Sequence, residues 1–122
     1  MKKKGFTLAE LLIVVAIIAV LVAVSIPIFA SQLHKARVAT DWENVRSYFS
    51  QLQYDYLETE KINSSYLHDD IFNPITSFDL SGQTVELKAG YILVREDGAN
   101  GYNILYMCKQ GHTDCQLVLP VS

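Results

Sequence analysis

The chain has 122 residues, enough for one small domain at most, and its apolar residues are concentrated near the N-terminus. Its formal net charge is -3, and without the lysines at positions 2–4 there would be seven basic residues against 13 acidic ones. That balance does not attract nucleic acid, so no direct nucleic-acid contact is expected. The three histidines are scattered, and neither a phosphate-binding glycine loop nor a nucleophile motif occurs, so we do not expect an enzyme.

An uncharged apolar run extends from Leu11 to Ala30. At about 1.5 Å per residue it would form a helix roughly 30 Å long, which matches the hydrocarbon core of a bilayer. The lysines at positions 2–4 precede the run, so the positive-inside tendency keeps the N-terminus cytoplasmic, although Lys35 and Arg37 weaken the asymmetry. We therefore expect a single-pass membrane protein in which the chain after residue 30 faces outward.

A single carboxylate, Glu10, lies at the edge of this apolar run. A charge carried into lipid costs about 3 kcal/mol on scales derived from membrane insertion. No lysine or arginine occurs between Gly5 and Lys35, so the segment offers no basic side chain within several helical turns. Glu10 therefore needs a cation from elsewhere, unless it snorkels to the headgroups as part of an ordinary anchor.

The segment around Glu10 reads KGFTLAELLIVV from Lys4 to Val15 and resembles the class III signal of type IV prepilins. The resemblance implies that a prepilin peptidase cuts between Gly5 and Phe6 and methylates the new amino group of Phe6. It also implies that this amine pairs with Glu10 of an adjacent subunit during assembly. At about 4 Å and an effective dielectric near 20, such a pair gains on the order of 4 kcal/mol, which would offset burying the carboxylate.

An ordinary secretory signal peptide, cut near Ala23–Ser25, is the main alternative for this segment. It would explain the lysines and the apolar run equally well. It would explain neither Glu10 nor an amphipathic pattern that continues past the supposed cut.

Beyond Ala30 the apolar residues become periodic, with spacings of four and three that are typical of one helix face. Polar residues, among them Asp41, lie between them. Neither Gly nor Pro occurs between Pro27 and residue 60, so we expect one helix from about Phe6 to about Glu58, with a local kink at Pro27. The periodic apolar residues are Val38, Trp42, Val45, Phe49, Leu52 and Tyr56.

The remaining chain is expected to form an irregular loop and a small antiparallel sheet. The loop covers Asn63 to Asp79, and the Val-, Ile- and Tyr-rich segments that follow predict a meander of three or four strands laid across the second half of the helix. The predicted strands are residues 83–88, 90–95, 102–108 and 115–119. With the resemblance, this gives an α+β type IV pilin fold with a leader (1–5), a transmembrane and assembly half-helix (6–30), an amphipathic half-helix (31–60) and a head (61–122).

Cys108 and Cys115 are expected to form a disulfide, because they lie close together in the part predicted to face outward. Closing this short loop would contribute roughly 2.5 kcal/mol. Two unpaired thiols are the alternative. His112 between them raises the possibility of a metal site, but three ligands at this spacing are weak evidence. Residues 96–100 offer oxygen ligands for calcium yet indicate a hairpin turn first, so neither a metal nor a cofactor is expected.

The resemblance implies a structural subunit of a type IV pilus, or fimbrium, that acts in adhesion, motility or surface interaction. The implied partners are other copies of the chain in a helical filament, the prepilin peptidase, the assembly platform, its motor ATPase and the membrane. The implied localisation is the inner or cytoplasmic membrane for the precursor and then an extracellular pilus. A competence or type II secretion pseudopilin, or a minor tip-binding pilin, remains the alternative.

Overall fold

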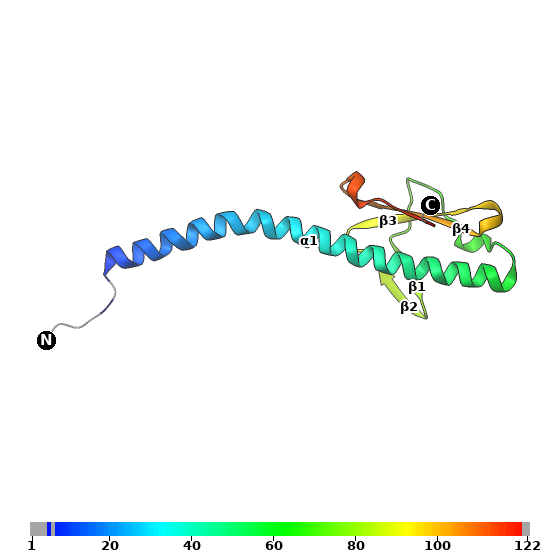
Figure 1. The fold of residues 1–122 in the computed structure, drawn as a ribbon, viewed down its shortest axis with the longest axis horizontal. Helices are drawn as coiled ribbons and strands as arrows, with labels where there is room; N and C mark the ends of the chain where they lie inside the picture. Colours follow the sequence, from blue (N-terminus) through cyan, green and yellow to red (C-terminus); the bar gives the residue numbers. More distant parts are fainter. Residues whose placement is uncertain (1–4, 6, 121–122) are drawn as a thin grey trace. The chain divides into compact units, whose positions relative to one another are not determined.

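The computed structural model describes residues 5 and 7–120, and it contains one long helix followed by small antiparallel sheets (Figure 1). This confirms the α+β class and is consistent with the type IV pilin fold. The chain divides into two compact units, one up to Lys35 and one from Ala36, which are described separately. The elements are α1 (Leu8–Thr59), β1 (Ser77–Leu80), β2 (Gln83–Glu86), β3 (Gly90–Glu96), β4 (Tyr102–Cys108) and β5 (Leu117–Leu119), with short 3-10 turns at Ser64–Tyr66, Gly98–Asn100 and Thr113–Cys115.

Helix α1 ends within one residue of the predicted position. Its last hydrogen bond runs from the Glu60 amide to the Tyr56 carbonyl (2.7 Å), and Glu60 itself has a left-handed φ of 58°, which stops the helix. The expected start at Phe6 lies outside the described residues. Pro27 is inside the helix, and the kink there stays a prediction.

The first unit consists of the apolar part of α1. An 18-residue window near the N-terminus has a mean hydropathy of 3.2, and none of that window is buried against the rest of the protein. The helix is thus long and apolar enough to cross a membrane. Because none of the described residues covers this apolar surface, its burial depends on lipid or on other molecules.

In the second unit, β3, β4 and β5 form an antiparallel sheet in that order. Ile92 lies opposite Tyr106, which in turn lies opposite Leu117. The meander is therefore confirmed with three strands. The prediction of a strand beginning at residue 115 was wrong at its start, because Thr113–Cys115 forms a 3-10 turn before β5 begins.

The predicted strand at 83–88 does not join this meander. Its first part is β2, which pairs with β1 in a separate two-stranded sheet. The sequence missed β1, because Phe78 and Leu80 alternate with polar residues over only four positions inside a stretch rich in turn formers. The positive φ angles of Ser81 and Gly82 close a tight turn between the strands.

The predicted irregular loop also contributes to the main sheet. His68 exchanges two backbone hydrogen bonds of 2.8 Å with Val94, and Ile75 does the same with Ile92 at 2.9 and 3.0 Å. These bridges occupy the edge of β3 that does not face β4. They satisfy backbone groups that would otherwise form an open sheet edge.

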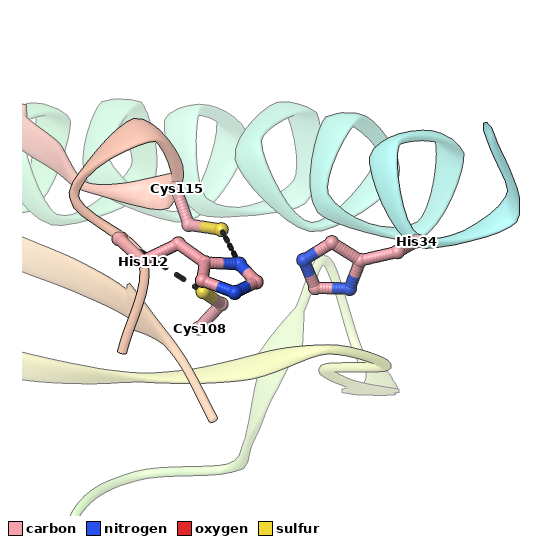
Figure 2. Close-up of side chains that lie close together, drawn as sticks. All are labelled: His34, Cys108, His112 and Cys115. Atoms are coloured by element: carbon pink, nitrogen blue, oxygen red, sulfur yellow. Dashed lines mark hydrogen bonds between the residues drawn. The ribbon is translucent and has the colours of Figure 1, made fainter. Parts of the chain in front are cut away.

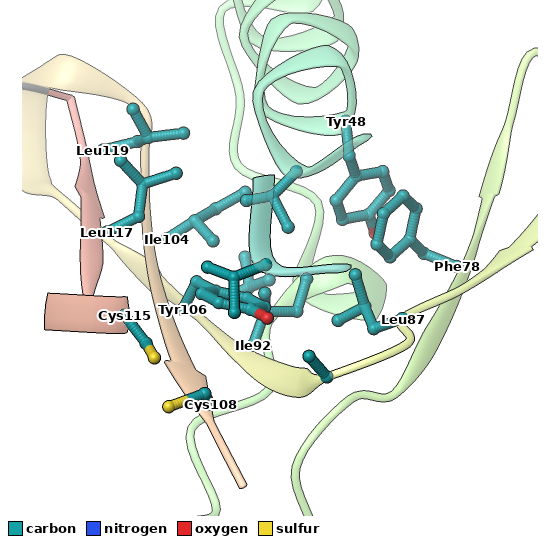
Figure 3. Packing of buried hydrophobic residues seen from close by; sticks show 14 of the residues in the cluster. Tyr48, Phe78, Leu87, Ile92, Ile104, Tyr106, Cys108, Cys115, Leu117 and Leu119 are labelled. Carbon is teal, nitrogen blue, oxygen red and sulfur yellow. The ribbon is translucent and has the colours of Figure 1, made fainter. Parts of the chain in front are cut away.

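The core of the second unit lies between α1 and the sheets. Figure 3 shows Ile92, Ile104 and Tyr106 gathered on one side, while Tyr48 stacks on Phe78 with ring centroids 4.3 Å apart on the other. The buried stripe of the helix is rotated from the predicted one. Its buried members are Val38, Asp41, Val45, Tyr48 and Leu52, whereas Trp42, Phe49 and Tyr56 are only partly buried.

Asp41 is the unexpected member of this stripe, with no exposed surface. Its carboxylate accepts hydrogen bonds from the backbone amides of Lys88 and Ala89, both at 2.8 Å, and from the Tyr106 hydroxyl at 2.7 Å. This role could not be predicted from the sequence, because an Asp between apolar residues of a helix is normally exposed. A buried carboxylate with three donors is instead a strong connection between helix and sheet.

The hydrogen bond between Tyr106 and Asp41 depends on two further properties, the small size of Gly90 and the raised pKa of Tyr106. A Cβ at Gly90 would lie 2.2 Å from the Met107 carbonyl oxygen and 2.7 Å from the Tyr106 ring, so only glycine leaves room for the tyrosine. Burial, followed by the hydrogen bond to Asp41, raises the pKa of Tyr106 far above its usual value. The hydroxyl therefore remains a donor throughout the physiological pH range.

We predict that Asp41→Ala destabilises the second unit by at least about 3 kcal/mol, because three buried donors lose their acceptor and each costs about 1–3 kcal/mol when left unpaired. Urea unfolding of the full chain in detergent, followed by the fluorescence of its single tryptophan, Trp42, measures this change. Glu43→Ala removes an exposed carboxylate from the same helical turn and serves as the control. Equal midpoints for the two variants would contradict the assigned role of Asp41.

Candidate processing and assembly site

The start of α1 is held by a reciprocal pair of hydrogen bonds between Thr7 and Glu10. The Thr7 amide donates to Oε2 of Glu10 at 3.1 Å, and the Glu10 amide donates to Oγ1 of Thr7 at 3.2 Å. This is a capping box, in which two amide groups that have no acceptor within the helix find one in a side chain. The pattern Thr-x-x-Glu before an apolar run could have revealed it from the sequence.

The capping box changes how the Glu10 charge is accommodated. A carboxylate in the first turn is favoured by the helix dipole, typically by about 0.3–1 kcal/mol. The cap uses one oxygen, and an ionised carboxylate can accept several hydrogen bonds, so the other oxygen is still able to accept one from a cation. Glu10 and Thr7 are both exposed in the single chain.

Farther along the apolar segment, Pro27 cannot donate to the carbonyl of Ala23. The Ser25 hydroxyl donates to the Leu21 carbonyl at 2.7 Å. Side-chain bonds of this kind often accompany bending, because they compete with the backbone hydrogen bonds of the helix. The two features together lie within residues 21–27, where the predicted kink at Pro27 would fall.

Gly5 lies before the helix and is exposed, and a Cβ added to it would meet no atom within 4 Å. The fold as described therefore does not require glycine at this position. Phe6, to which the cut, the methylation and half of the charge pair are assigned, lies outside the described residues.

The structure brings Cys108 and Cys115 together near the end of β4, far in sequence from the segment just described. Both are buried and in the thiol form, so the disulfide stays a prediction. Burial, reinforced by Cys108, raises the pKa of Cys115 to about 11. At neutral pH this group is therefore a protonated thiol.

Comparison with known proteins agrees with the features of the N-terminal segment. Residues 1–26 match the family described as the prokaryotic N-terminal methylation motif. The fimbrial protein EcpB of Eikenella corrodens is 49% identical over 37 residues, which are 30% of this chain and 23% of that protein. No solved structure matches.

These findings define the chain as one with a prepilin-type N-terminus on an α+β fold. The methylation motif and the fimbrial relative support the type IV pilin family and, within it, a pilin-like structural subunit. That family is structural rather than enzymatic. A membrane-anchored precursor with this type of N-terminus fits the long apolar helix found here.

We predict that Thr7→Ala loosens the first turn of α1 without altering the second unit. Loss of a threonine cap costs about 1 kcal/mol, so the Glu10 amide should exchange its hydrogen about fivefold faster. Hydrogen exchange of the uncut chain in micelles, followed by NMR, measures this rate. Thr40→Ala, which removes a mid-helix bond to Ala36, is the control. An unchanged Glu10 amide would contradict the capping box.

Proposed function

We propose that this chain is a structural subunit of a bacterial type IV pilus, assembled from the membrane by packing of its N-terminal helices. The observation that carries the proposal is the position of Glu10, a capped carboxylate at the end of an apolar helix surface that no residue in the described part of the chain covers. A filament of many copies would bury that surface helix against helix. It would also bring each Glu10 close to a neighbour's N-terminus.

The proposed cut between Gly5 and Phe6 supplies the cation that the sequence lacks. It releases an amine at Phe6, and methylation keeps that amine basic. Pairing with Glu10 of an adjacent copy would contribute on the order of 4 kcal/mol at an effective dielectric near 20. That gain offsets the cost of roughly 3 kcal/mol for moving a carboxylate into apolar surroundings. A buried polar contact of this kind would also fix the stagger between subunits.

The proposed division of the chain follows from this scheme. Residues 1–5 are the leader, 6–30 insert into the membrane and later pack in the filament, 31–60 carry the amphipathic half of the helix, and 61–122 form the head. The exposed head would determine what the filament touches in adhesion or motility. The proposed partners are identical subunits, the prepilin peptidase, the assembly platform and the motor ATPase.

The first test is intact-mass and N-terminal peptide analysis of filaments sheared from cells that express the chain. We expect an abundant subunit that has lost residues 1–5 and begins with N-methylated Phe6. A methylated chain that stays in the membrane would favour a secretion or competence pseudopilin, and a scarce filament component would favour a minor pilin. A chain beginning near Ile26 would overturn the proposal in favour of ordinary secretion.

Gly5→Ser is the matched variant for this test, because the described structure offers space for the added side chain. We expect an uncut chain with an unchanged head and no filaments. Normal cleavage of this variant would contradict the assignment of the cut.

A second prediction separates the charge of Glu10 from its capping role. Glu10→Gln keeps an oxygen that can accept from Thr7 but removes the charge, whereas Thr7→Val removes the side-chain cap and keeps the charge. If the charge pair drives assembly, Glu10→Gln and Glu10→Ala should both lower filament yield at least tenfold, because the Phe6 amine then loses a contact worth on the order of 4 kcal/mol. Thr7→Val should assemble nearly normally.

The yield is measured by electron microscopy and quantification of the sheared fraction, with cleavage checked in each variant. Normal filaments from Glu10→Gln as the sole subunit would contradict the charge pair. The proposed cut would remain supported by the mass of the product.

A further inference from the structure

The turn that follows β4 gathers two thiols and an imidazole. Cys108 is the last residue of β4, and Cys115 ends the 3-10 turn before β5, with His112 between them in a Cys-x3-His-x2-Cys arrangement. Figure 2 shows both sulfur atoms directed toward the His112 ring. One ligand atom from each of the three residues lies within 4.8 Å of the others, and Cys115 Sγ is 3.9 Å from Nδ1 of His112.

The backbone holds these groups in place by specific contacts. The Gly111 amide donates to the Cys108 carbonyl at 2.9 Å, and Gly111 has a φ of +73°, so the chain reverses sharply after β4. The Cys115 amide donates to the His112 carbonyl at 3.2 Å. The Cys115 carbonyl accepts from the Trp42 indole at 2.9 Å, which ties this turn to α1 within the second unit.

The spacing of the three groups suits a tetrahedral metal ion. With Zn–S bonds of about 2.3 Å and a Zn–N bond of about 2.0 Å, neighbouring ligand atoms lie about 3.5–3.8 Å apart. The observed separations of 4.8 Å or less require at most a small inward movement. His112 is exposed and can make that movement, whereas Cys108 and Cys115 are fixed by burial.

We propose that the reduced chain binds one zinc ion through Cys108 Sγ, Cys115 Sγ and an imidazole nitrogen of His112. Two thiolates and one imidazole form a donor set that favours zinc over calcium or magnesium, which prefer oxygen. Binding releases the two thiol protons and leaves one tetrahedral position for water or another donor. The ion would fasten the 3-10 turn and β5 to the end of β4.

The zinc site and the expected disulfide exclude each other, because both use the same two sulfur atoms. A disulfide places the sulfurs about 2.05 Å apart and leaves no thiolate to bind metal. Zinc binding is therefore a property of the reduced chain, and oxidation abolishes it. The proposal does not depend on filament assembly and is tested on the isolated chain.

The test uses the full chain in detergent with a phosphine reductant, freed of metal and titrated with Co²⁺ as a spectroscopic probe and then with Zn²⁺. We expect one Co²⁺ per chain, with a thiolate-to-cobalt charge-transfer band and tetrahedral d–d bands that Zn²⁺ abolishes. Zn²⁺ should also slow alkylation of both cysteines in the unsubstituted protein, measured by mass spectrometry. This second measurement does not depend on the folding of any variant.

His112→Ala should weaken Zn²⁺ binding at least tenfold, and Cys115→Ser should abolish the charge-transfer band or at least halve it. His68→Ala is the control, because His68 pairs with Val94 away from this turn and should bind Zn²⁺ normally. Absence of one-to-one binding, unchanged alkylation with Zn²⁺, or equal affinity in His112→Ala and His68→Ala would each overturn the proposal.

Discussion

The carboxylate of Asp41 is the contact on which the arrangement of the second unit depends. It joins the helix to the segment between β2 and β3 through two backbone amides, and to β4 through the Tyr106 hydroxyl. Hydrogen bonds to a charged group contribute about 1.5–3 kcal/mol each, which is large beside the stability of so small a domain. The hydrogen bond to Asp41 also explains the close contact at Gly90, because the Tyr106 ring lies against Gly90 while its hydroxyl reaches the helix.

Other polar side chains of α1 also form hydrogen bonds with backbone groups of the segments that pack against the helix. The Gln51 side chain accepts from the Ser81 amide and donates to the Asp79 carbonyl, at the turn between β1 and β2. The Gln53 side chain donates to the Asn100 carbonyl and accepts from the Tyr102 amide, at the start of β4. Helix side chains thus satisfy the backbone of loops that have little regular structure. Buried polar side-chain atoms in the described part of the chain all have partners.

Sequence periodicity predicted the elements better than it predicted their contacts. The long helix and the three-stranded meander follow from spacing and from Val- and Ile-rich segments, and these were correct. Asp41, Gln51 and Gln53 could not be recognised, because a polar residue on a helix is exposed in most proteins and its role here depends on distant backbone groups. The hairpin β1–β2 was missed because its strands are short and only partly buried.

The candidate site residues show the same difference. Some lie in one continuous sequence motif, whereas others come together only through the fold. The segment Lys4–Val15 is a continuous motif, so roles for Gly5, Phe6 and Glu10 could be predicted from the sequence alone, and these roles stay predictions. The Thr7–Glu10 cap was equally local and was overlooked. The approach of His112 to Cys108 and Cys115 is different, because it depends on the chain reversal at Gly111 and on the Trp42 contact, neither of which the spacing of the residues reveals.

The two units differ in where their stability comes from. The second unit buries its apolar residues and pairs its buried polar side chains within itself, so substitutions there act on folding. Among the described residues, none covers the most apolar window of the first unit's helix, so its free energy depends on whatever surrounds it outside the chain. A capped but uncompensated carboxylate at its end adds little to folding of the single chain. In the single chain Glu10 forms two capping hydrogen bonds with Thr7, so the proposed pairing with a second chain would act on assembly and not on folding.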